Sequence, residues 1–442
     1  MFLLALGGRV VAGQINAMTT LKHSFRLRSA TRFMWIASFL AARFALRVSQ
    51  IVMLAQSGNS ALITDNEMSR RAKPKIIDLF AGVGGFSLGA VRAGFELAAA
   101  VDLDRHAVDA HQKNFPHAAH ARRDIFGLCG DDIRDLAKLN GHRLTGLIGG
   151  PPCQGFSTMG RMRKNDARNK LFFHFFRLIS ELNPLFFVCE NVPGILDEKY
   201  ETLREESFKV VKRKYHMLDP FELSAGDFGA ATERSRVFFV GWAKDAGIGL
   251  SLGYFTPSPR VKKVTVRSAF AGLPKRIDPN WQTEESGWRR VDLTESDFTD
   301  TINKLVPGVV GDKTALDRFA QHSEVSGFLG TIHTRKVIAR FAEVEPGKMD
   351  SVSKFPRLKW DALCPTLRAG TAKDRGSYQA ARPIHPSQDR VITPREAARL
   401  QGFPDWFLFH QTKWHSFRQI GNSIPPLLAE GILRLLAGAA SS

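Results

Sequence analysis

The chain has 442 residues, of which 44% are hydrophobic, and it carries a formal net charge of +19 at pH 7. This length exceeds what one compact core usually holds, so we expect two domains. The most apolar stretch, residues 33–46, is broken by Arg43, and no run of about 18 uninterrupted apolar residues exists, which excludes a predicted membrane span.

The basic excess predicts a polyanionic partner, most often a nucleic acid. Residues 1–64 contain seven Lys or Arg and no Asp or Glu, and subtracting these seven charges from +19 leaves +12 on the remainder. The basic character therefore extends through the chain and is not confined to its N-terminal stretch.

Residues 1–72 differ in composition from everything that follows, being apolar, basic and poor in turn signals. An organelle transit peptide, a basic arm with non-specific DNA affinity, and a start assigned too far upstream all fit this composition. We favour the last, with translation from Met68, because "MSRRAKPKIIDLF" places a methionine a few residues before the first predicted strand. We expect 1–72 to be disordered or wrongly included.

From Lys75 the pattern predicts strands that alternate with helices. Apolar strands are expected at 75–80, 96–104, 144–150, 184–192 and 236–243, and helices at 84–95, 107–115 and 171–183. Such alternation is typical of an α/β fold, a Rossmann-like parallel sheet covered on both faces. From 245 to 389 the alternation stops, and we predict a smaller irregular domain there.

The C-terminal stretch 390–442 returns to regular structure. Thr393, Pro394 and Glu396 form the signature of a capped helix start, and residues 425–439 are amphipathic. We therefore predict four parts: an extension at 1–72, a catalytic domain at 73–244, the irregular domain at 245–389, and a return segment at 390–442.

The turn after the first strand is rich in glycine, with Gly82, Gly84 and Gly85. These glycines allow close approach of a ligand, but their spacing is not the GxGxxG of dinucleotide binders. Asp102 ends the second strand, where an acid commonly accepts hydrogen bonds from ribose hydroxyls. The pattern favours a nucleoside cofactor without a pyrophosphate, while a merely structural turn remains an alternative.

Cys153 lies in "GGPPCQGFS", directly after a predicted buried strand. The four cysteines include no CxxC pair, so neither a disulfide framework nor a metal site is predicted. Glu190 ends the next strand, and Arg234 and Arg236 begin another. A thiol beside a carboxylic acid suits nucleophilic attack on an electron-poor ring that is protonated as it is attacked.

These residues belong to a longer series of ordered blocks between 75 and 442. The blocks are "DLFAGVGGFSLG", "VDLD", "GDDIRD", "GGPPCQGFS", "LNPLFFVCENV", "FGAATERSRVFFVG", "TPREAARLQGFP" and "QIGNSIPP". In this order they resemble the DNA (cytosine-5) methyltransferases. The resemblance implies S-adenosylmethionine as the cofactor, double-stranded DNA as the partner, and a target cytosine that is flipped out of the duplex.

The resemblance also implies roles for individual residues. Cys153 resembles the nucleophile that adds to cytosine C6, and Glu190 the acid that contacts N3, with Arg234 and Arg236 beside the flipped base. Phe80 resembles the residue that stacks on adenine, Asp102 the acid that binds ribose, and Asp132 the acid that contacts the adenine amine. The cofactor site is completed by Asp78, Gly82, Gly84, Gly85, Pro152, Asn422 and Ser423.

For DNA, the stretch 157–170 resembles a mobile loop that closes over the duplex and carries five basic side chains. Ser157, Arg161 and Arg163 in this loop, together with Thr366, are predicted DNA contacts. Residues 245–389 correspond to the target-recognition domain, which is expected to read base edges in the major groove. Thr232 departs from the family's usual Gln two positions before Arg234.

Two alternatives remain: a tRNA cytosine-5 methyltransferase of the same fold, and a catalytically inactive DNA-binding regulator. The tRNA enzymes typically carry "PPCQPFT" in place of "PPCQGFS", and the intact Cys153, Glu190, Arg234 and Arg236 count against an inactive regulator. We expect a monomeric bacterial or phage-like modification enzyme, cytoplasmic and nucleoid-associated. A cognate restriction endonuclease would be its genetic rather than physical partner.

Overall fold

The computed structural model describes residues 73–152, 170–258, 261–293, 296–304, 310–369 and 382–441. The predicted extension at 1–72 lies outside these residues. Residues Lys73–Ser442 form one compact unit. Within the described residues, no helix has both the length and the apolar character that a membrane span needs.

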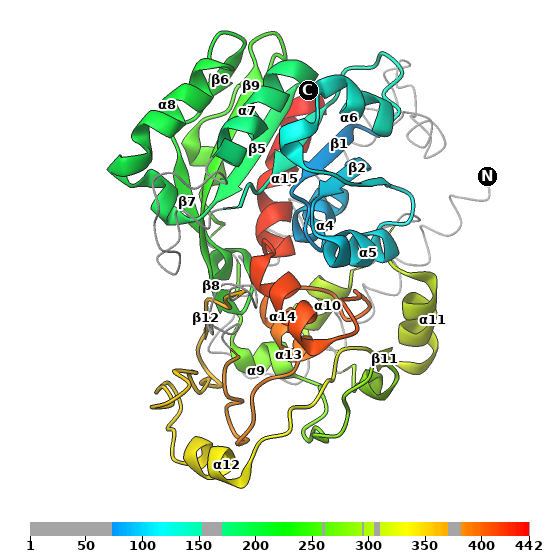
Figure 1. Ribbon diagram of the computed structural model, residues 1–442, viewed down its shortest axis with the longest axis vertical. Helices are drawn as coiled ribbons and strands as arrows, with labels where there is room; N and C mark the ends of the chain where they lie inside the picture. Colours follow the sequence, from blue (N-terminus) through cyan, green and yellow to red (C-terminus); the bar gives the residue numbers. More distant parts are fainter. Residues whose placement is uncertain are drawn as a thin grey trace, which may run out of the picture. The chain divides into compact units, whose positions relative to one another are not determined.

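The centre of this unit is an eight-stranded sheet with the order β3-β2-β1-β4-β5-β9-β6, and β7 also pairs with β9 (Figure 1). The first five strands are parallel: β1 (Lys75–Leu79), β2 (Glu96–Asp102), β3 (Ala119–Arg122), β4 (Gly146–Gly149) and β5 (Phe186–Asn191). β9 (Ser235–Ala243) runs antiparallel to β5, and β6 (Tyr215–Met217) and β7 (Phe221–Ser224) run antiparallel to β9.

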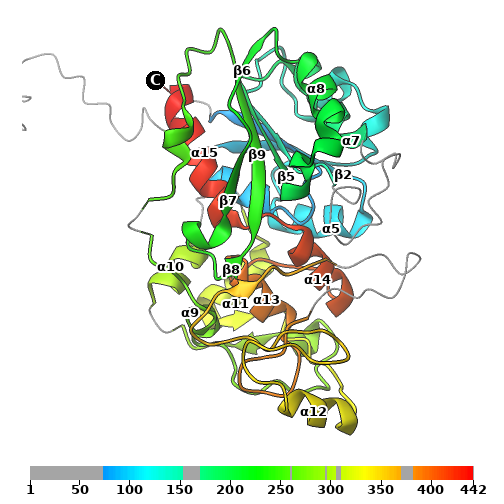
Figure 2. The ribbon, with the colours of Figure 1, turned by 90° about the vertical axis from the view of Figure 1, so that its left-hand side faces the viewer.

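Helices cover both faces of the sheet, as the alternating pattern predicted. One face carries α4 (Gly85–Arg92), α5 (Arg105–Asn114) and α15 (Pro426–Ser441), and the other carries α6 (Gly130–Leu136), α7 (Lys170–Leu182) and α8 (Glu201–Lys209). Figure 2 shows the sheet between α15 and the pair α7 and α8. Successive strand residues face opposite cores: Ile76 packs in the first core and Ile77 in the second.

The predicted parallel sheet is confirmed for its first five strands, whereas the strand at 236–243 runs antiparallel. This strand inserts antiparallel between β5 and β6, because the chain enters it from the neighbouring β7 and β8 rather than through a helical crossover. Its continuous apolar sequence arises from burial on both faces, which looks the same for either strand direction.

The region 245–389 holds short elements: α9 (Val266–Phe270), β10 (Arg289–Arg290), α10 (Asp297–Asn303), α11 (Lys313–His322), β11 (Glu324–Val325), α12 (Arg335–Ala342) and β12 (Cys364–Pro365). Two small sheets pair β10 with β11, and β12 with β8 (Thr232–Glu233). One hydrophobic core continues from Ile76 under the large sheet to Phe270 and Val325 in this region. Because this core includes residues on both sides of 244/245 and of 389/390, the domain boundaries predicted there remain a proposal.

The return segment contributes α13 (Pro394–Leu400), α14 (Lys413–Asn422) and α15. The predicted capping box is present in α13, where Thr393 Oγ1 accepts from the Glu396 backbone N–H and Glu396 accepts from the Thr393 N–H. α13 packs against α9, whereas α15 packs against α4. The remaining short 3-10 helices are Ile125–Gly127, Pro193–Leu196, Glu198–Tyr200, Ala225–Phe228, Leu252–Phe255 and Glu285–Gly287.

Candidate active site

The glycine turn follows β1 at the carboxyl edge of the sheet. Phe80 adopts φ +60°, which is uncommon for a residue with a side chain and indicates local strain. Gly84 has φ +102° at the N-cap of α4, and a Cβ there would lie 2.4 Å from the ring of Phe115. A residue with a side chain would therefore disrupt this turn, whose open backbone suits close approach of a ligand.

Asp102 connects the end of β2 to this turn. The backbone N–H of Gly82 donates to its Oδ2 at 2.9 Å, and the N–H of Asp104 donates to its Oδ1 at 2.8 Å. Burial raises the pKa of the Asp102 carboxyl. The structure thus brings together Phe80, Gly82 and Asp102, three of the predicted cofactor residues.

Asp78 lies beneath the same turn and is 1% exposed. Ser87 donates to its Oδ2 at 2.6 Å, while Oδ1 is buried with no hydrogen-bond partner among the described residues. Burial raises the pKa of Asp78 to about 8, and the Asp102 charge adds to the effect. Ser87 also lies 3.0 Å from Nε2 of His111, whose own pKa is lowered well below the usual value by burial.

The end of α14 meets the start of α4, as the resemblance implied. A Cβ on Gly85 would lie 2.1 Å from Ser423 Oγ and 2.2 Å from the Ile424 carbonyl oxygen, so only glycine allows this approach. Asn422 beside it is exposed. The ion pair between Arg92 Nε and Glu430 Oε2, at 2.7 Å, further holds α15 against α4.

Asp132 occupies a different place from the other predicted cofactor residues. It lies in the first turn of α6, where its carboxylate accepts from the Cys129 backbone N–H at 2.8 Å. The acid that directly follows β3 is Asp124, and the last residue of β3, Arg122, is paired in register with Asp102. Sequence reasoning missed Asp124 because it did not predict the short strand β3, which precedes it in "AHARRD".

Glu190 is the penultimate residue of β5 and forms an ion pair with Arg236 at the start of β9, with Oε1 2.6 Å from Nε. Its other oxygen, Oε2, lies 2.9 Å from the position that a Cβ of Gly150 would take. The Asn191 amide donates to the Pro151 carbonyl at 3.3 Å. These contacts hold the "GGPP" turn, which ends at the half-buried Pro152, against β5.

Arg234 is nearly fully buried and donates to the Leu367 carbonyl at 3.2 Å. Thr232, the departure from the family pattern, donates from Oγ1 to the Cys364 carbonyl at 3.1 Å. Thr366 donates in turn to the Glu233 carbonyl. This short strand pair therefore connects the end of the irregular region to the start of β9, and Thr232 contributes to that connection.

The predicted residues Cys153, Ser157, Arg161 and Arg163 lie outside the described residues. The remaining cysteines differ in environment. Cys189 and Cys364 are buried, and burial raises the pKa of both thiols, which disfavours the nucleophilic thiolate. Cys129 is exposed, at the N-cap of α6.

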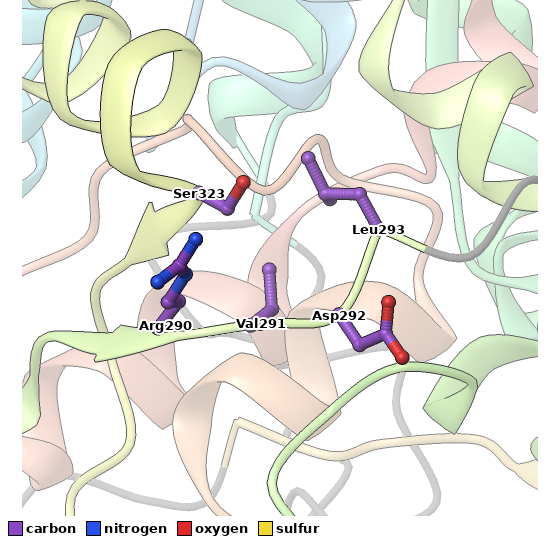
Figure 3. Close-up of a pocket in the computed structure, with 5 residues that line it drawn as sticks. All are labelled: Arg290, Val291, Asp292, Leu293 and Ser323. Carbon is purple, nitrogen blue, oxygen red and sulfur yellow. The ribbon is translucent and has the colours of Figure 1, made fainter.

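A pocket of about 430 Å³ lies elsewhere, beside β10 and the end of α11 (Figure 3). It is lined by Arg290, Val291, Asp292, Leu293 and Ser323. None of the predicted catalytic or cofactor residues lines this pocket, so we place the candidate active site at the carboxyl edge of the sheet.

Comparisons with known proteins identify the family of the chain. The C-5 cytosine-specific DNA methylase family matches residues 74–437. The type II methyltransferase M.XorII of Xanthomonas oryzae pv. oryzae is 40% identical over 366 residues, covering 81% of this chain and 84% of that protein. The M.DdeI type II methyltransferase of Desulfomicrobium norvegicum is 32% identical, covering 81% of this chain and 87% of its own length.

Solved structures give the same result. A crystal structure of a DNA modification methyltransferase encoded within a prophage, from E. coli, has a TM-score of 0.75 and 45% identity, covering 83% of this chain and 99% of that chain. The S. pombe Dnmt2 methyltransferase shares the fold, with a TM-score of 0.55 at 18% identity, covering 82% of this chain and 98% of its own. The chain belongs to the C-5 cytosine-specific DNA methylase family and is a DNA (cytosine-5) methyltransferase that uses S-adenosylmethionine.

Proposed function

We propose that the carboxyl edge of the sheet is the active site of this methyltransferase, with Cys153 as the nucleophile and Glu190 as the acid. The observation that carries this proposal is the Glu190–Arg236 ion pair, which lies against Gly150 in the turn that leads into Cys153. Arg236 holds the carboxylate in one orientation and leaves its Oε2 directed toward this turn. Cys189 and Cys364 are buried and Cys129 caps α6, so we assign the attack on the base to Cys153, which follows this turn in the sequence.

The residues at the glycine turn fit S-adenosylmethionine. Asp102 is fixed at the end of β2 by two backbone donors, an arrangement suited to ribose hydroxyls. The unpartnered Oδ1 of Asp78 suits the ammonium group of the methionine part, because a cation would satisfy a buried carboxylate oxygen. Gly82, Gly84, Gly85, Phe80, Pro152, Asn422 and Ser423 would complete the site.

For the acid that contacts the adenine amine, we now prefer Asp124 to Asp132. Both carboxylates cap helices, Asp124 the 3-10 helix Ile125–Gly127 and Asp132 α6, but only Asp124 lies just after β3, at the same edge as Asp102. Matched Asp124→Asn and Asp132→Asn variants test this choice, and we expect only the first to weaken cofactor binding.

The chain's own residues would act on the base as follows. The Cys153 thiolate forms a bond to C6 of the flipped cytosine, and the electron pair of the C5–C6 double bond becomes available at C5. Glu190 hydrogen-bonds or protonates N3, which stabilises the negative charge that the addition moves into the ring. When bound, S-adenosylmethionine supplies an electrophilic methyl group. A base then removes the C5 proton, and the electron pair of that C–H bond restores the double bond and expels the Cys153 thiolate.

DNA binding would use the loop at 157–170, with Ser157, Arg161 and Arg163, together with Thr366 and the region 245–389. Basic side chains in the loop would neutralise phosphates, which contributes affinity without sequence preference. We further propose a monomer that acts in the bacterial cytoplasm at the nucleoid, with a restriction endonuclease as a genetic partner. The bacterial type II methyltransferases among its relatives support this assignment.

Trapping the covalent adduct tests the proposed roles. DNA that carries 5-fluorocytosine at the position that the enzyme methylates should form a denaturation-resistant complex with the wild type. The fluorine at C5 cannot leave as the proton does. Cys153→Ser should form no complex, whereas the exposed-thiol control Cys129→Ser should form it like the wild type. An adduct in Cys153→Ser, or none in the wild type with S-adenosylmethionine present, would contradict the proposal.

A further inference from the structure

Three histidines far apart in the sequence meet where α5 lies beside α14. His106 is in the first turn of α5, His410 precedes α14, and His415 lies within α14. Their ring centroids are 4.6 Å apart for His106 and His410, 4.0 Å for His106 and His415, and 4.4 Å for His410 and His415. One nitrogen of each ring lies within 4.8 Å of the corresponding nitrogens of the other two.

The ring nitrogens of this cluster are largely free of other partners. Within the described part of the chain, no hydrogen bond reaches a ring nitrogen of His106 or His415, and all three residues are half-buried. In His410, Nδ1 accepts from the Thr412 backbone N–H at 3.0 Å. Three imidazole nitrogens gathered this closely, with little else bonded to them, can serve one metal ion together.

Two of the three rings, His410 and His415, have pKa values below the usual range for histidine. Burial lowers the pKa of His410 to about 4, and the neighbouring His415 and His106 add to this effect. Burial also lowers the pKa of His415. A neutral imidazole keeps the lone pair with which histidine binds metal ions.

We propose that His106, His410 and His415 form a binding site for a divalent transition-metal ion such as Zn²⁺, with solvent in the fourth position. Imidazole nitrogen suits zinc, copper and nickel, and three histidines with one open position form a known tetrahedral arrangement. Ligand nitrogens around zinc are about 3.3 Å apart, given metal–nitrogen distances of about 2.0–2.1 Å. The three rings would therefore draw together by rotation of their side chains.

Metal binding through Nε2 of His410 would require a change of tautomer. The ring that accepts from the Thr412 N–H carries its proton on Nε2; this proton would move to Nδ1, and the hydrogen bond from the Thr412 N–H would be lost. The Thr412 hydroxyl, 3.0 Å from Nδ1, is placed to accept it. Such an acceptor commonly orients a metal-binding histidine.

The ion would connect two segments that frame the cofactor site. α5 begins at Arg105, three residues after Asp102, and α14 ends at Asn422 beside Ser423. The first turn of α5 is close to α14 (Figure 2), and the Gln419 amide donates to the His106 carbonyl at 2.9 Å. The Arg418–Asp104 ion pair, at 2.9 Å, spans the same contact. We expect a bound ion to stabilise the attachment of the return segment to the sheet.

Metal titration of the full chain tests this inference. After chelator treatment, Zn²⁺ is titrated calorimetrically, Co²⁺ by absorption, and the midpoint of thermal unfolding is measured with and without Zn²⁺. The variants are His106→Gln and His415→Gln, and the control is His322→Gln, an exposed histidine at the end of α11. Circular dichroism of the metal-free variants establishes that each one folds.

We expect one Zn²⁺ per chain, a rise in the unfolding midpoint, and an affinity at least tenfold weaker in either cluster variant than in His322→Gln. Because two variants alter different helices, misfolding of one leaves the other as a test. The inference is overturned if the wild type binds no Zn²⁺ at micromolar concentration, or if both folded cluster variants bind as tightly as the control. A thiolate-to-cobalt charge-transfer band would also overturn it by assigning the ion to a cysteine.

Discussion

At the scale of single residues, the proposed acid depends on one carboxylate held by one guanidinium. Glu190→Gln keeps the shape of the side chain but removes the carboxyl group that contacts Arg236 and that would carry the proton to N3. We expect the rate of a single turnover to fall by about 10²-fold or more, as is typical when general acid catalysis is lost. Glu198→Gln, an exposed change in the following 3-10 helix, is the matched control. Equal rates in the two variants would show that Glu190 is not the acid.

Asp78 predicts a pH dependence of stability in the cofactor-free protein. Its folded-state pKa, about 8, lies above its usual value of 3.8, so between these values the folded protein holds a proton that the unfolded chain has lost. The protonated carboxyl thus favours folding at low pH, and this contribution decreases as the pH rises towards 8. His111 acts in the opposite direction, but below its usual pKa of 6.5, so it does not oppose Asp78 between pH 6.5 and 8.

Between pH 6.5 and 8, the free energy of unfolding should therefore decrease less steeply with rising pH in Asp78→Asn than in the wild type. Denaturant titration at each pH measures this. Each unit of pKa shift corresponds to about 1.4 kcal/mol. The raised pKa of Asp102 acts in the same direction in both proteins, so the difference between the wild type and the variant reports on Asp78. An equally steep fall in both proteins would mean that Asp78 is already ionised in the folded state.

At the scale of elements, α13 joins the irregular region to the return segment through buried charges. Arg399 and Asp405 form a fully buried ion pair, with Nη2 2.7 Å from Oδ2, and Arg395 donates to the carbonyls of Ser326, Pro404 and Phe407. Asp405→Asn leaves the Arg399 charge buried without its carboxylate. We expect the free energy of unfolding to fall by about 3–5 kcal/mol, the cost of breaking such a pair.

The control for Asp405→Asn is Asp361→Asn, which removes an exposed ion pair with Arg267. Because water solvates and screens both groups, this change should have little effect on chemical denaturation. A similar decrease in the free energy of unfolding in both variants would show that burial does not set the strength of the Arg399–Asp405 pair.

Elements with strong local signals could be predicted from the sequence. The capped start of α13 and the β1–turn–α4 unit follow from Thr393, Glu396 and the glycines, since local chemistry decides them. The direction of β9 could not be predicted, because burial on both faces erases the alternation that distinguishes antiparallel strands. β3, with the half-exposed sequence "AHAR", gave no apolar signal, and Asp124 was missed with it.

Long-range contacts limited prediction of the site. The block resemblance implied that Ser423 returns to the glycine turn, and the approach to Gly85 agrees with this. No spacing in the sequence relates His106 to His410 and His415, so a metal site was not predicted. The partner of Thr232 was also unpredictable, because the Cys364 carbonyl is brought to it by the pairing of β8 with β12.

At the scale of the whole molecule, we assign the methyl transfer to the sheet and recognition of the DNA sequence to residues 245–389. Sequence specificity should then be transferable with this region. Replacing 245–389 with the equivalent region of M.XorII should change the DNA sequence that is methylated and leave the chemistry intact. The chimera must keep the contacts that Ser326 and Ala269 make with Arg395 and Arg399, because these hold the region to α13. An active chimera with unaltered sequence preference would place specificity elsewhere.

The central claim is that this chain methylates C5 of cytosine in DNA through Cys153. Bisulfite sequencing of DNA from cells that express the wild type or Cys153→Ser, in a host without cytosine-5 methylation, tests it most directly. We expect cytosines that resist bisulfite conversion within one defined sequence for the wild type, and none for Cys153→Ser. Absence of protected cytosines with abundant folded wild-type protein, or equal protection by Cys153→Ser, would contradict it.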